Sequence, residues 1–265
     1  MRYNKADSVR LCAELAFLIE RENMNIGVIL AAGTGSRVGA EVPKQFIKVN
    51  EKPILAYTLD VFQTNKNIDC IEIVCHRDWI EEVEEICRIY KIDKVKWICI
   101  GGDTFQRSVM NGVMNLKGKI QDEDIVVLSF GVSPMTPQGD IDDSIRVCIE
   151  HGNAIASKDI DLCTCIKDDE LSTTQNIFRE SLKGFANPWT FRFGELYEAY
   201  KLADDMKILD KIEPHTTSLY LALNKRLWFS PCTSVQDKIT HKSDVEMFKA
   251  FLLLKKEKEK KDDYI

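Results

Sequence analysis

A glycine-rich segment near the start of the chain carries the residue types that bind phosphate. Residues 30–39 read L-A-A-G-T-G-S-R-V-G, follow an apolar run and lead into P-K-Q-F at 43–46. Glycines let backbone N–H groups approach an anion closely. Arg37 and Lys44 stand beside this turn, where a triphosphate needs its charge neutralised. The segment predicts a phosphate site, and the alternative, a tight turn with two surface cations, stays open.

The glycine spacing excludes two common phosphate motifs. Gly33, Gly35 and Gly39 match neither G-x-G-x-x-G nor a P-loop, which ends in Gly-Lys-Ser/Thr. No acidic residue follows a second strand where a dinucleotide ribose would need it. A nicotinamide-dependent Rossmann protein is therefore a weak alternative.

Strand-like and helical segments alternate after the glycine-rich segment. Strands are predicted at 25–31, 69–75, 94–100, 124–130 and 153–157, and helices at 53–64, 78–90, 105–116 and 137–150. Strands separated by helices form βαβ units with right-handed crossovers. We expect an α/β fold with a Rossmann-like, mostly parallel sheet and helices on both faces. Ligands of such sheets bind at the carboxyl edge, where the glycine-rich segment would lie.

The remainder predicts one domain over 24–255 with additions at both ends. Residues 160–185 break the alternation and predict a protruding hairpin or arm. Later segments are predicted as helices at 191–203 and 214–223, a strand at 226–230, and a last helix near Ser243, whose spacing to Glu246 fits a capping box. Residues 1–23 predict an appended helix, and 256–265 a charged tail.

Composition limits the partners and the compartment. Lys and Arg number 36 against 42 Asp and Glu, a net charge of −6, which argues against nucleic-acid and membrane partners. No long apolar run or secretory signal occurs. The nine cysteines are predicted to be reduced, mostly buried thiols of a cytoplasmic protein, with Cys163 and Cys165 at alternate positions of one strand. The four histidines lack metal-site spacing.

The motifs taken together resemble those of the polyol-phosphate cytidylyltransferases, within the wider nucleotide-diphospho-sugar transferase type of fold. That family includes the methylerythritol-phosphate enzyme of isoprenoid synthesis and the ribitol-phosphate enzymes of cell-wall and capsule synthesis. The matching segments are A-A-G-x-G-x-R-x-G with P-K-Q-F, G-G-D at 101–103, S-V-x-N-G at 108–112, P-M-T-P with D-I-D at 134–142, N-P-x-x-F at 187–191, and K-I-T-x-x-x-D at 238–244.

The resemblance implies transfer of CMP from CTP to a polyol phosphate with release of pyrophosphate, by a homodimer joined through the arm. It implies that Mg²⁺ arrives with CTP. Arg37, Lys44 and Lys238 would stabilise the phosphates as catalytic residues. The nucleotide-binding residues would be Ala31, Ala32, Gly33, Thr34, Gly35, Gly101, Gly102, Asp103 and Ser108.

The chain departs from the family at the residues that hold the metal. Phe130 stands where the metal-binding Asp is expected, Ser133 where an Arg is expected, and Pro214 where the second Asp is expected. Ile160 occupies the position of an Arg in a substrate-binding R-D-T motif. Asp103, Asp161 and Glu213 are the carboxylates that a shifted metal site would use. Two hypotheses follow: a cytidylyltransferase, or a catalytically impaired nucleotide-binding relative with a scaffolding or regulatory role.

Overall fold

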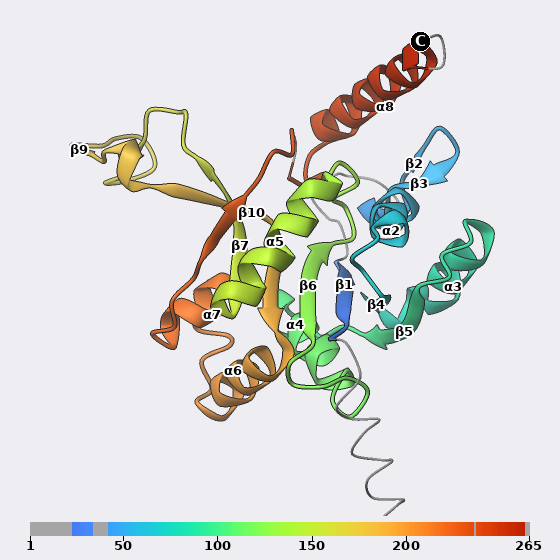
Figure 1. The fold of residues 1–265 in the computed structure, drawn as a ribbon. Helices are drawn as coiled ribbons and strands as arrows, with labels where there is room; N and C mark the ends of the chain where they lie inside the picture. The colour runs from blue at the N-terminus through green and yellow to red at the C-terminus, as the bar shows by residue number, and fades with distance from the viewer. Residues whose placement is uncertain (1–22, 34–41, 236, 263–265) are drawn as a thin grey trace, which may run out of the picture.

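A seven-stranded sheet runs through the centre of the molecule in the order β11–β7–β10–β6–β1–β4–β5 (Figure 1). The computed structural model describes residues 23–33, 42–235 and 237–262. The strands are β1 (Asn25–Ala31), β4 (Cys70–Cys75), β5 (Val95–Ile100), β6 (Ile125–Phe130), β7 (Asn153–Asp159), β10 (Lys183–Arg192) and β11 (Phe229–Pro231). Residues 1–22 of the predicted N-terminal helix, together with Thr34, Gly35 and Arg37, lie outside the described residues.

The expected α/β sheet is confirmed, and it contains one strand that the sequence did not predict. β1 pairs in parallel with β4 and β6, and β4 pairs in parallel with β5. β10 runs antiparallel between β6 and β7. Its register shifts between Phe185 and Trp189, around Asn187–Pro188, so the regular alternation that marks a strand is interrupted. The predicted helix at 191–203 consequently begins only at Phe193.

Helices cover both faces of the sheet. One core packs β1 residues Ile26 and Val28 against helices α4 (Phe105–Asn115), α6 (Phe193–Asp205) and α7 (Thr216–Ala222). The other packs Ile29 and Ala31 against α2 (Ile54–Thr64), α3 (Ile80–Ile89) and α5 (Gln138–His151). Successive strand residues point to opposite faces, which is why one apolar strand supplies both cores.

A carboxylate lies inside the first of these cores. Glu72 of β4 is fully buried; its Oε1 accepts a hydrogen bond of 2.6 Å from Asn115 Nδ2, and its Oε2 has no hydrogen-bond partner. Burial raises the pKa of Glu72 to about 7, despite the Asn115 hydrogen bond, because a carboxylate loses its hydration there.

We expect Glu72→Gln to stabilise the protein at alkaline pH. In the unfolded chain Glu72 has its ordinary pKa of 4.5, so the folded protein binds the proton more tightly. The free energy of unfolding therefore falls as the pH rises from 4.5 to about 7, and it stays lower above pH 7. The variant should unfold with a free energy about 2 kcal/mol higher at pH 8 and show little difference at pH 4. Urea unfolding at both pH values measures this. Exposed Glu81→Gln is the control, and equal pH slopes in Glu72→Gln and the unmodified protein would contradict the prediction.

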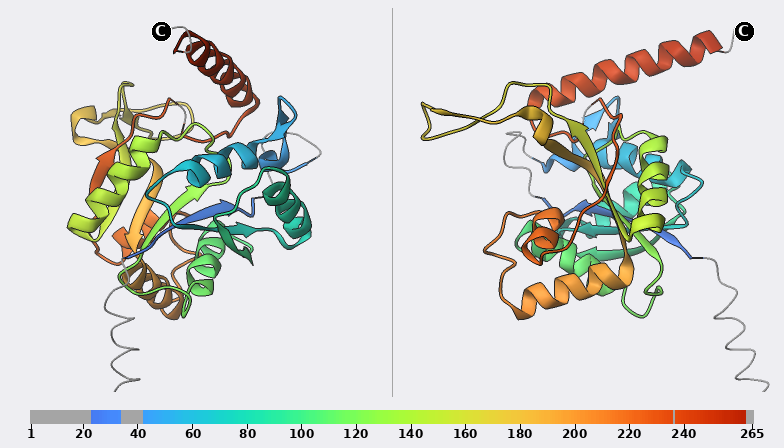
Figure 2. Two further views of the ribbon diagram at one scale, coloured as in Figure 1. Left: turned by 45° about the vertical axis from the view of Figure 1, so that its right-hand side comes forward. Right: turned by 60° about the vertical axis from the view of Figure 1, so that its left-hand side comes forward.

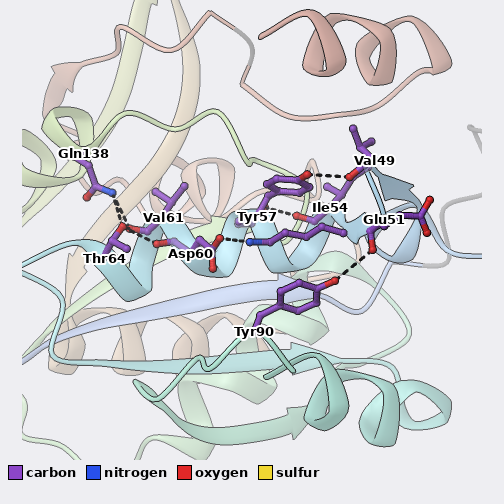
Figure 3. A network of polar contacts seen from close by, with 11 residues as sticks. Val49, Glu51, Ile54, Tyr57, Asp60, Val61, Thr64, Tyr90 and Gln138 are labelled. Carbon is purple, nitrogen blue, oxygen red and sulfur yellow. Dashed lines mark hydrogen bonds and ion pairs between the residues drawn. The ribbon is translucent and has the colours of Figure 1, made fainter. Parts of the chain in front are cut away.

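A small hairpin after the glycine-rich segment is anchored to α2. β2 (Lys48–Val49) and β3 (Lys52–Pro53) form it, directly after the 3₁₀ helix η1 (Lys44–Phe46). Figure 3 shows Tyr57 Oη donating to Val49 O at 2.9 Å, and Tyr90 Oη donating to Glu51 O at 3.3 Å. The ammonium of Lys52 pairs with Asp60 and lies over the rings of both tyrosines. These contacts fix the hairpin that follows Lys44 in the chain.

Two segments project from the body of the molecule (Figure 2). The excursion after β7 carries a short antiparallel pair, β8 (Cys165–Ile166) and β9 (Gln175–Asn176), followed by the 3₁₀ helix η3 (Arg179–Ser181). The expectation that Cys163 and Cys165 share a strand is wrong, because β8 begins at Cys165, and both thiols are exposed rather than buried.

The last helix, α8 (Lys242–Asp262), also stands away from the sheet. Asp244 Oδ2 accepts hydrogen bonds from the backbone N–H groups of Thr240, at 2.7 Å, and His241, at 2.8 Å. The cap predicted at Ser243 is therefore wrong: the helix begins earlier, and Asp244 occupies the position from which a side chain reaches back to the N-cap. In the part of the chain described here, no helix is long and apolar enough to cross a membrane.

Candidate active site at the carboxyl edge of the sheet

A cavity of about 590 Å³ opens where β1, β4, β5 and β6 end. Parallel strands place their carboxyl ends at one edge, and the loops that follow surround a common space. The lining residues are Leu30, Ala31, Ala32, Gly33, Lys44, Gln45, His76, Arg77, Ile100, Gly101, Gly102, Asp103, Thr104, Phe105, Ser108, Phe130, Val132 and Lys238. This set contains every predicted site residue that the structure describes.

The P-K-Q-F motif fixes the entry to the glycine-rich segment. Gln45 is buried, and its Nε2 donates to the carbonyl oxygens of Ala31 at 2.7 Å and Gly33 at 2.9 Å. Phe46 stacks on Trp79 with ring centroids 4.7 Å apart. Gln45 thus holds the backbone where the glycine-rich segment leaves β1, and Phe46 is buried. Lys44, the residue before them, faces the cavity.

Gly101 and Gly102 form the opposite rim because no larger residue fits there. A Cβ on Gly101 would lie 2.5 Å from Ala32 Cβ and 2.9 Å from Ser108 Oγ. Ser108 Oγ accepts from Gly102 N and donates to Gly102 O, both at 3.1 Å. This side presents mostly backbone to a ligand, with the exposed Asp103 beside it.

We expect Gly101→Ala to damage the site through its shape. The new methyl group forces the loop after β5 away from Ala32, which should weaken CTP binding by about tenfold or more and lower the melting temperature. Gly139→Ala is the matched control, because a Cβ there meets nothing within 4 Å. Calorimetric titration and thermal melting test the pair, and equal behaviour of the two variants would show that this rim does not contact the nucleotide.

Cations from distant parts of the chain meet across the cavity. Lys44 Nζ donates to Ile239 O at 3.1 Å, and Ile239 N donates to Val132 O at 2.8 Å. These bonds join the segment that carries Lys238 to Lys44, and both lysines line the cavity. Their role as catalytic residues stays a prediction. Arg77 and His76, which the sequence analysis missed, also line the cavity. The signal was available, because both follow β4 directly at the carboxyl edge.

An aromatic cluster stands at the end of β6, where the resemblance to the family expects a metal-binding Asp that this chain lacks. It consists of Phe105, Phe130, Trp189 and His215. Phe130 lies 5.8 Å from Phe105 and 5.4 Å from Trp189, measured between ring centroids. Lys238 Nζ lies 4.3 Å from the centroid of the Phe130 ring, within the range of a cation–π interaction. Phe105 and Phe130 face the cavity.

The segment that carries Pro214 is held by buried hydrogen bonds. Gln106 Nε2 donates to the carbonyl oxygens of His215 at 2.8 Å and Glu213 at 3.3 Å, and Tyr200 Oη donates to Gln106 Oε1 at 2.9 Å. Burial lowers the pKa of His215, and Lys238 lowers it further, while Glu213 acts in the opposite direction. Pro214 itself is exposed and does not line the cavity.

The acidic D-I-D motif at 140–142 and the Asn187–Pro188 pair do not line the cavity but hold segments that do. Asp140 is buried and accepts from Thr233 Oγ1 at 2.7 Å and Thr233 N at 2.9 Å, which anchors the chain leading to Lys238. Asn187 Nδ2 donates to Ser129 Oγ at 3.0 Å and Thr136 Oγ1 at 3.2 Å. Asp140 therefore holds the chain that leads to Lys238, and Asn187 holds Ser129, the residue before Phe130.

These residues do not fit a protein-held magnesium ion at the end of β6. Mg²⁺ requires oxygen ligands, and the described side chains in ring or cation contact with Phe130 are those of Phe105, Trp189 and Lys238. Of the shifted candidates, Asp103 lines the cavity, while Asp161 and Glu213 do not. Asp237 is held by the backbone N–H of Asn187. No group of three or more His, Cys, Asp or Glu side chains suited to a metal occurs within residues 23–33, 42–235 and 237–262.

Comparison with known proteins identifies the family. Residues 26–252 match the 2-C-methyl-D-erythritol 4-phosphate cytidylyltransferase family. The chain belongs to this family. A ribitol-5-phosphate cytidylyltransferase from Lacticaseibacillus paracasei is 35% identical over 229 residues, which is 86% of this chain and 98% of the relative. A 2-C-methyl-D-erythritol 4-phosphate cytidylyltransferase from Clostridium tetani is 30% identical over 241 residues, 86% of this chain and 90% of the relative.

Solved structures of the 2-C-methyl-D-erythritol 4-phosphate cytidylyltransferase family share the fold. The 4-diphosphocytidyl-2C-methyl-D-erythritol synthase of Anaerococcus prevotii superposes with a TM-score of 0.73 at 20% identity, covering 87% of this chain and 96% of that one. The Francisella tularensis family member has a TM-score of 0.71 at 23% identity, covering 85% and 98%. The family is one of nucleotidyltransferase enzymes, so the resemblance in the motifs is confirmed for the family and the fold.

Proposed function

We propose that the protein transfers CMP from CTP to a polyol phosphate and releases pyrophosphate. The observation that supports this most directly is the convergence of Lys44 and Lys238 on one cavity lined by backbone from the ends of β1 and β5. Family membership and the names of the relatives point to the same reaction.

The reaction requires charge neutralisation and alignment more than covalent help from the protein. A phosphate oxygen of the acceptor attacks the α-phosphorus of CTP and forms the new P–O bond. The bond from the α-phosphorus to the bridging oxygen breaks, and its electron pair leaves with pyrophosphate. Lys44 and Arg37 would stabilise the triphosphate, and Lys238 would stabilise the charge on the side of the acceptor. The backbone at Gly101 and Gly102, with Ser108, would hold the nucleoside.

The acceptor is either ribitol 5-phosphate or 2-C-methyl-D-erythritol 4-phosphate under this proposal. Greater identity to a ribitol-5-phosphate enzyme, 35% against 30%, favours ribitol 5-phosphate as the first acceptor to test. Mg²⁺ enters the proposal bound to CTP, without a ligand from the cavity wall at Phe130.

The experiment is a pyrophosphate-release assay with CTP, Mg²⁺ and each of the two acceptors. Release that depends on an acceptor, together with the matching CDP-polyol in a mass spectrum, is the expected result. Binding of CTP without turnover on either acceptor would instead support the second candidate, a nucleotide-binding relative with a scaffolding or regulatory role. The aromatic cluster in place of a metal carboxylate is the observation that favours this second candidate.

We also propose that the protein is a cytoplasmic homodimer joined through the arm at about 160–185. The arm projects from the body and exposes apolar side chains: Leu171 is 98% exposed and Phe178 is 75% exposed. A second copy that covered them would remove this apolar surface from water. Sedimentation equilibrium should give twice the chain mass, and the double substitution Leu171→Ser with Phe178→Ser should shift the protein to monomers. A monomeric mass for the unmodified protein would reject the dimer.

A further inference from the structure

Lys238 and Phe130 meet in the cavity lining at the end of β6. The ammonium of Lys238 lies on the face of Phe130, 4.3 Å from the ring centroid. A divalent cation bound at the same place would lie against the Lys238 ammonium, and none of the described side chains in ring or cation contact with Phe130 is a carboxylate. The ammonium can therefore supply positive charge where the resemblance places the metal, as a replacement for it.

The charges around the cavity agree with this replacement. Among the described residues, the cavity lining contains the cations Lys44, Arg77 and Lys238 and a single carboxylate, that of Asp103. An excess of fixed positive charge favours the more negative form of a ligand. Metal-free CTP carries more negative charge than CTP that has Mg²⁺ bound.

We propose that this protein binds CTP through its own cations, without a divalent ion bridging protein and nucleotide, and that Lys238 on Phe130 supplies the charge at that position. The inference rests on the proposed function in taking CTP as the ligand. It deepens that function by naming how the phosphates are held.

The test is the dissociation constant of CTP for the full chain, measured by calorimetry in excess EDTA and in excess MgCl₂. We expect CTP to bind equally well or more tightly in EDTA. Binding that is tighter in Mg²⁺ by more than about threefold would overturn the inference. Absence of binding in both buffers would overturn the proposed function together with the inference, whereas binding that requires Mg²⁺ overturns the inference alone.

Two variants assign the effect to the Lys238–Phe130 pair. Lys238→Met keeps an unbranched side chain against the ring and should weaken binding in EDTA by about tenfold or more. Lys242→Met, at the exposed start of α8, is the control and should leave binding unchanged. Equal CTP affinities in EDTA for the unmodified protein, Lys238→Met and Lys242→Met would show that Lys238 does not replace the charge of the metal.

Phe130→Asp restores an oxygen ligand beside the cavity. We expect its affinity for CTP to become higher in Mg²⁺ than in EDTA, and Mn²⁺ added without nucleotide should give a protein-bound electron paramagnetic resonance signal. The unmodified protein should give no such signal. A bound Mn²⁺ signal in the unmodified protein would overturn the inference, independently of any activity. If Phe130→Asp does not fold, the Lys238→Met comparison still decides the question.

Discussion

Lys44→Ala is expected to weaken CTP binding by about 100-fold, the value of one charge-assisted contact to a phosphate. The side chain has a second role, because its Nζ donates to Ile239 O at 3.1 Å and ties the Lys238 segment to the cavity. Alanine removes both the charge and this tie. Calorimetric titration with CTP measures the loss directly.

The matched control for Lys44 is Lys48→Ala. Lys48 lies four residues further along, in β2, is exposed and does not line the cavity. Its removal changes the net charge by the same amount and should leave CTP affinity within about twofold. Comparable losses in both variants would mean that general charge, and not the position of Lys44, governs binding.

Lys238→Met is expected to reduce kcat for CMP transfer by about 1000-fold, which corresponds to about 4 kcal/mol of transition-state stabilisation. The loss in kcat should exceed the loss in CTP affinity, because negative charge on the transferring and leaving oxygens is greatest in the transition state. Steady-state kinetics with the accepted polyol phosphate separates kcat from KM. The melting temperature should change little, since Lys238 is only partly buried.

A second comparison makes the Lys238 result specific. Lys158 of β7 contacts the segment that carries Lys238, because its Nζ donates to Ser234 O, but it does not line the cavity. Lys158→Met should alter stability more than turnover. If Lys158→Met and Lys238→Met reduced kcat equally with matching losses of stability, Lys238 would be a structural residue only.

The residues that the resemblance assigns to nucleotide binding could be placed at one edge of the sheet because they belong to motifs that directly follow strands; their role in binding stays a prediction. Gly101 and Gly102 are constrained by close approach of Ala32 and Arg107, which fixes residue type and spacing together, whereas a Cβ on Gly33 would meet nothing within 4 Å. The resemblance alone assigned Lys44 and Lys238 to one site; both line the same cavity, and Lys44 Nζ donates to Ile239 O. Arg77 belongs to no motif, and its place at the site follows only from its position directly after β4, the strand that pairs with β1.

At the end of β6 the sequence indicated only which residues were missing. Phe130 and Pro214 stand at the two positions where the family has metal-binding Asp residues. The aromatic cluster found there could not be predicted, because no spacing rule connects Phe105, Phe130, Trp189 and His215 along the chain. Trp189 reaches the cluster from β10, the strand that was not predicted. The neighbours of Trp189 depend on the antiparallel pairing of β10 with β6 and β7. That pairing could not be predicted from local sequence patterns, so Trp189 could not be placed.

The bond between Lys44 and Ile239 joins parts of the chain 195 residues apart. A ligand held between Lys44 and Lys238 would therefore hold these two parts of the chain together. Its binding free energy adds to the free energy needed to separate the segment before α8 from β1 and α2. The backbone amide of Ile239, which bonds to Val132 O, should then exchange its hydrogen more slowly as CTP concentration rises, and the base of α8 becomes a reporter of occupancy far from the nucleoside.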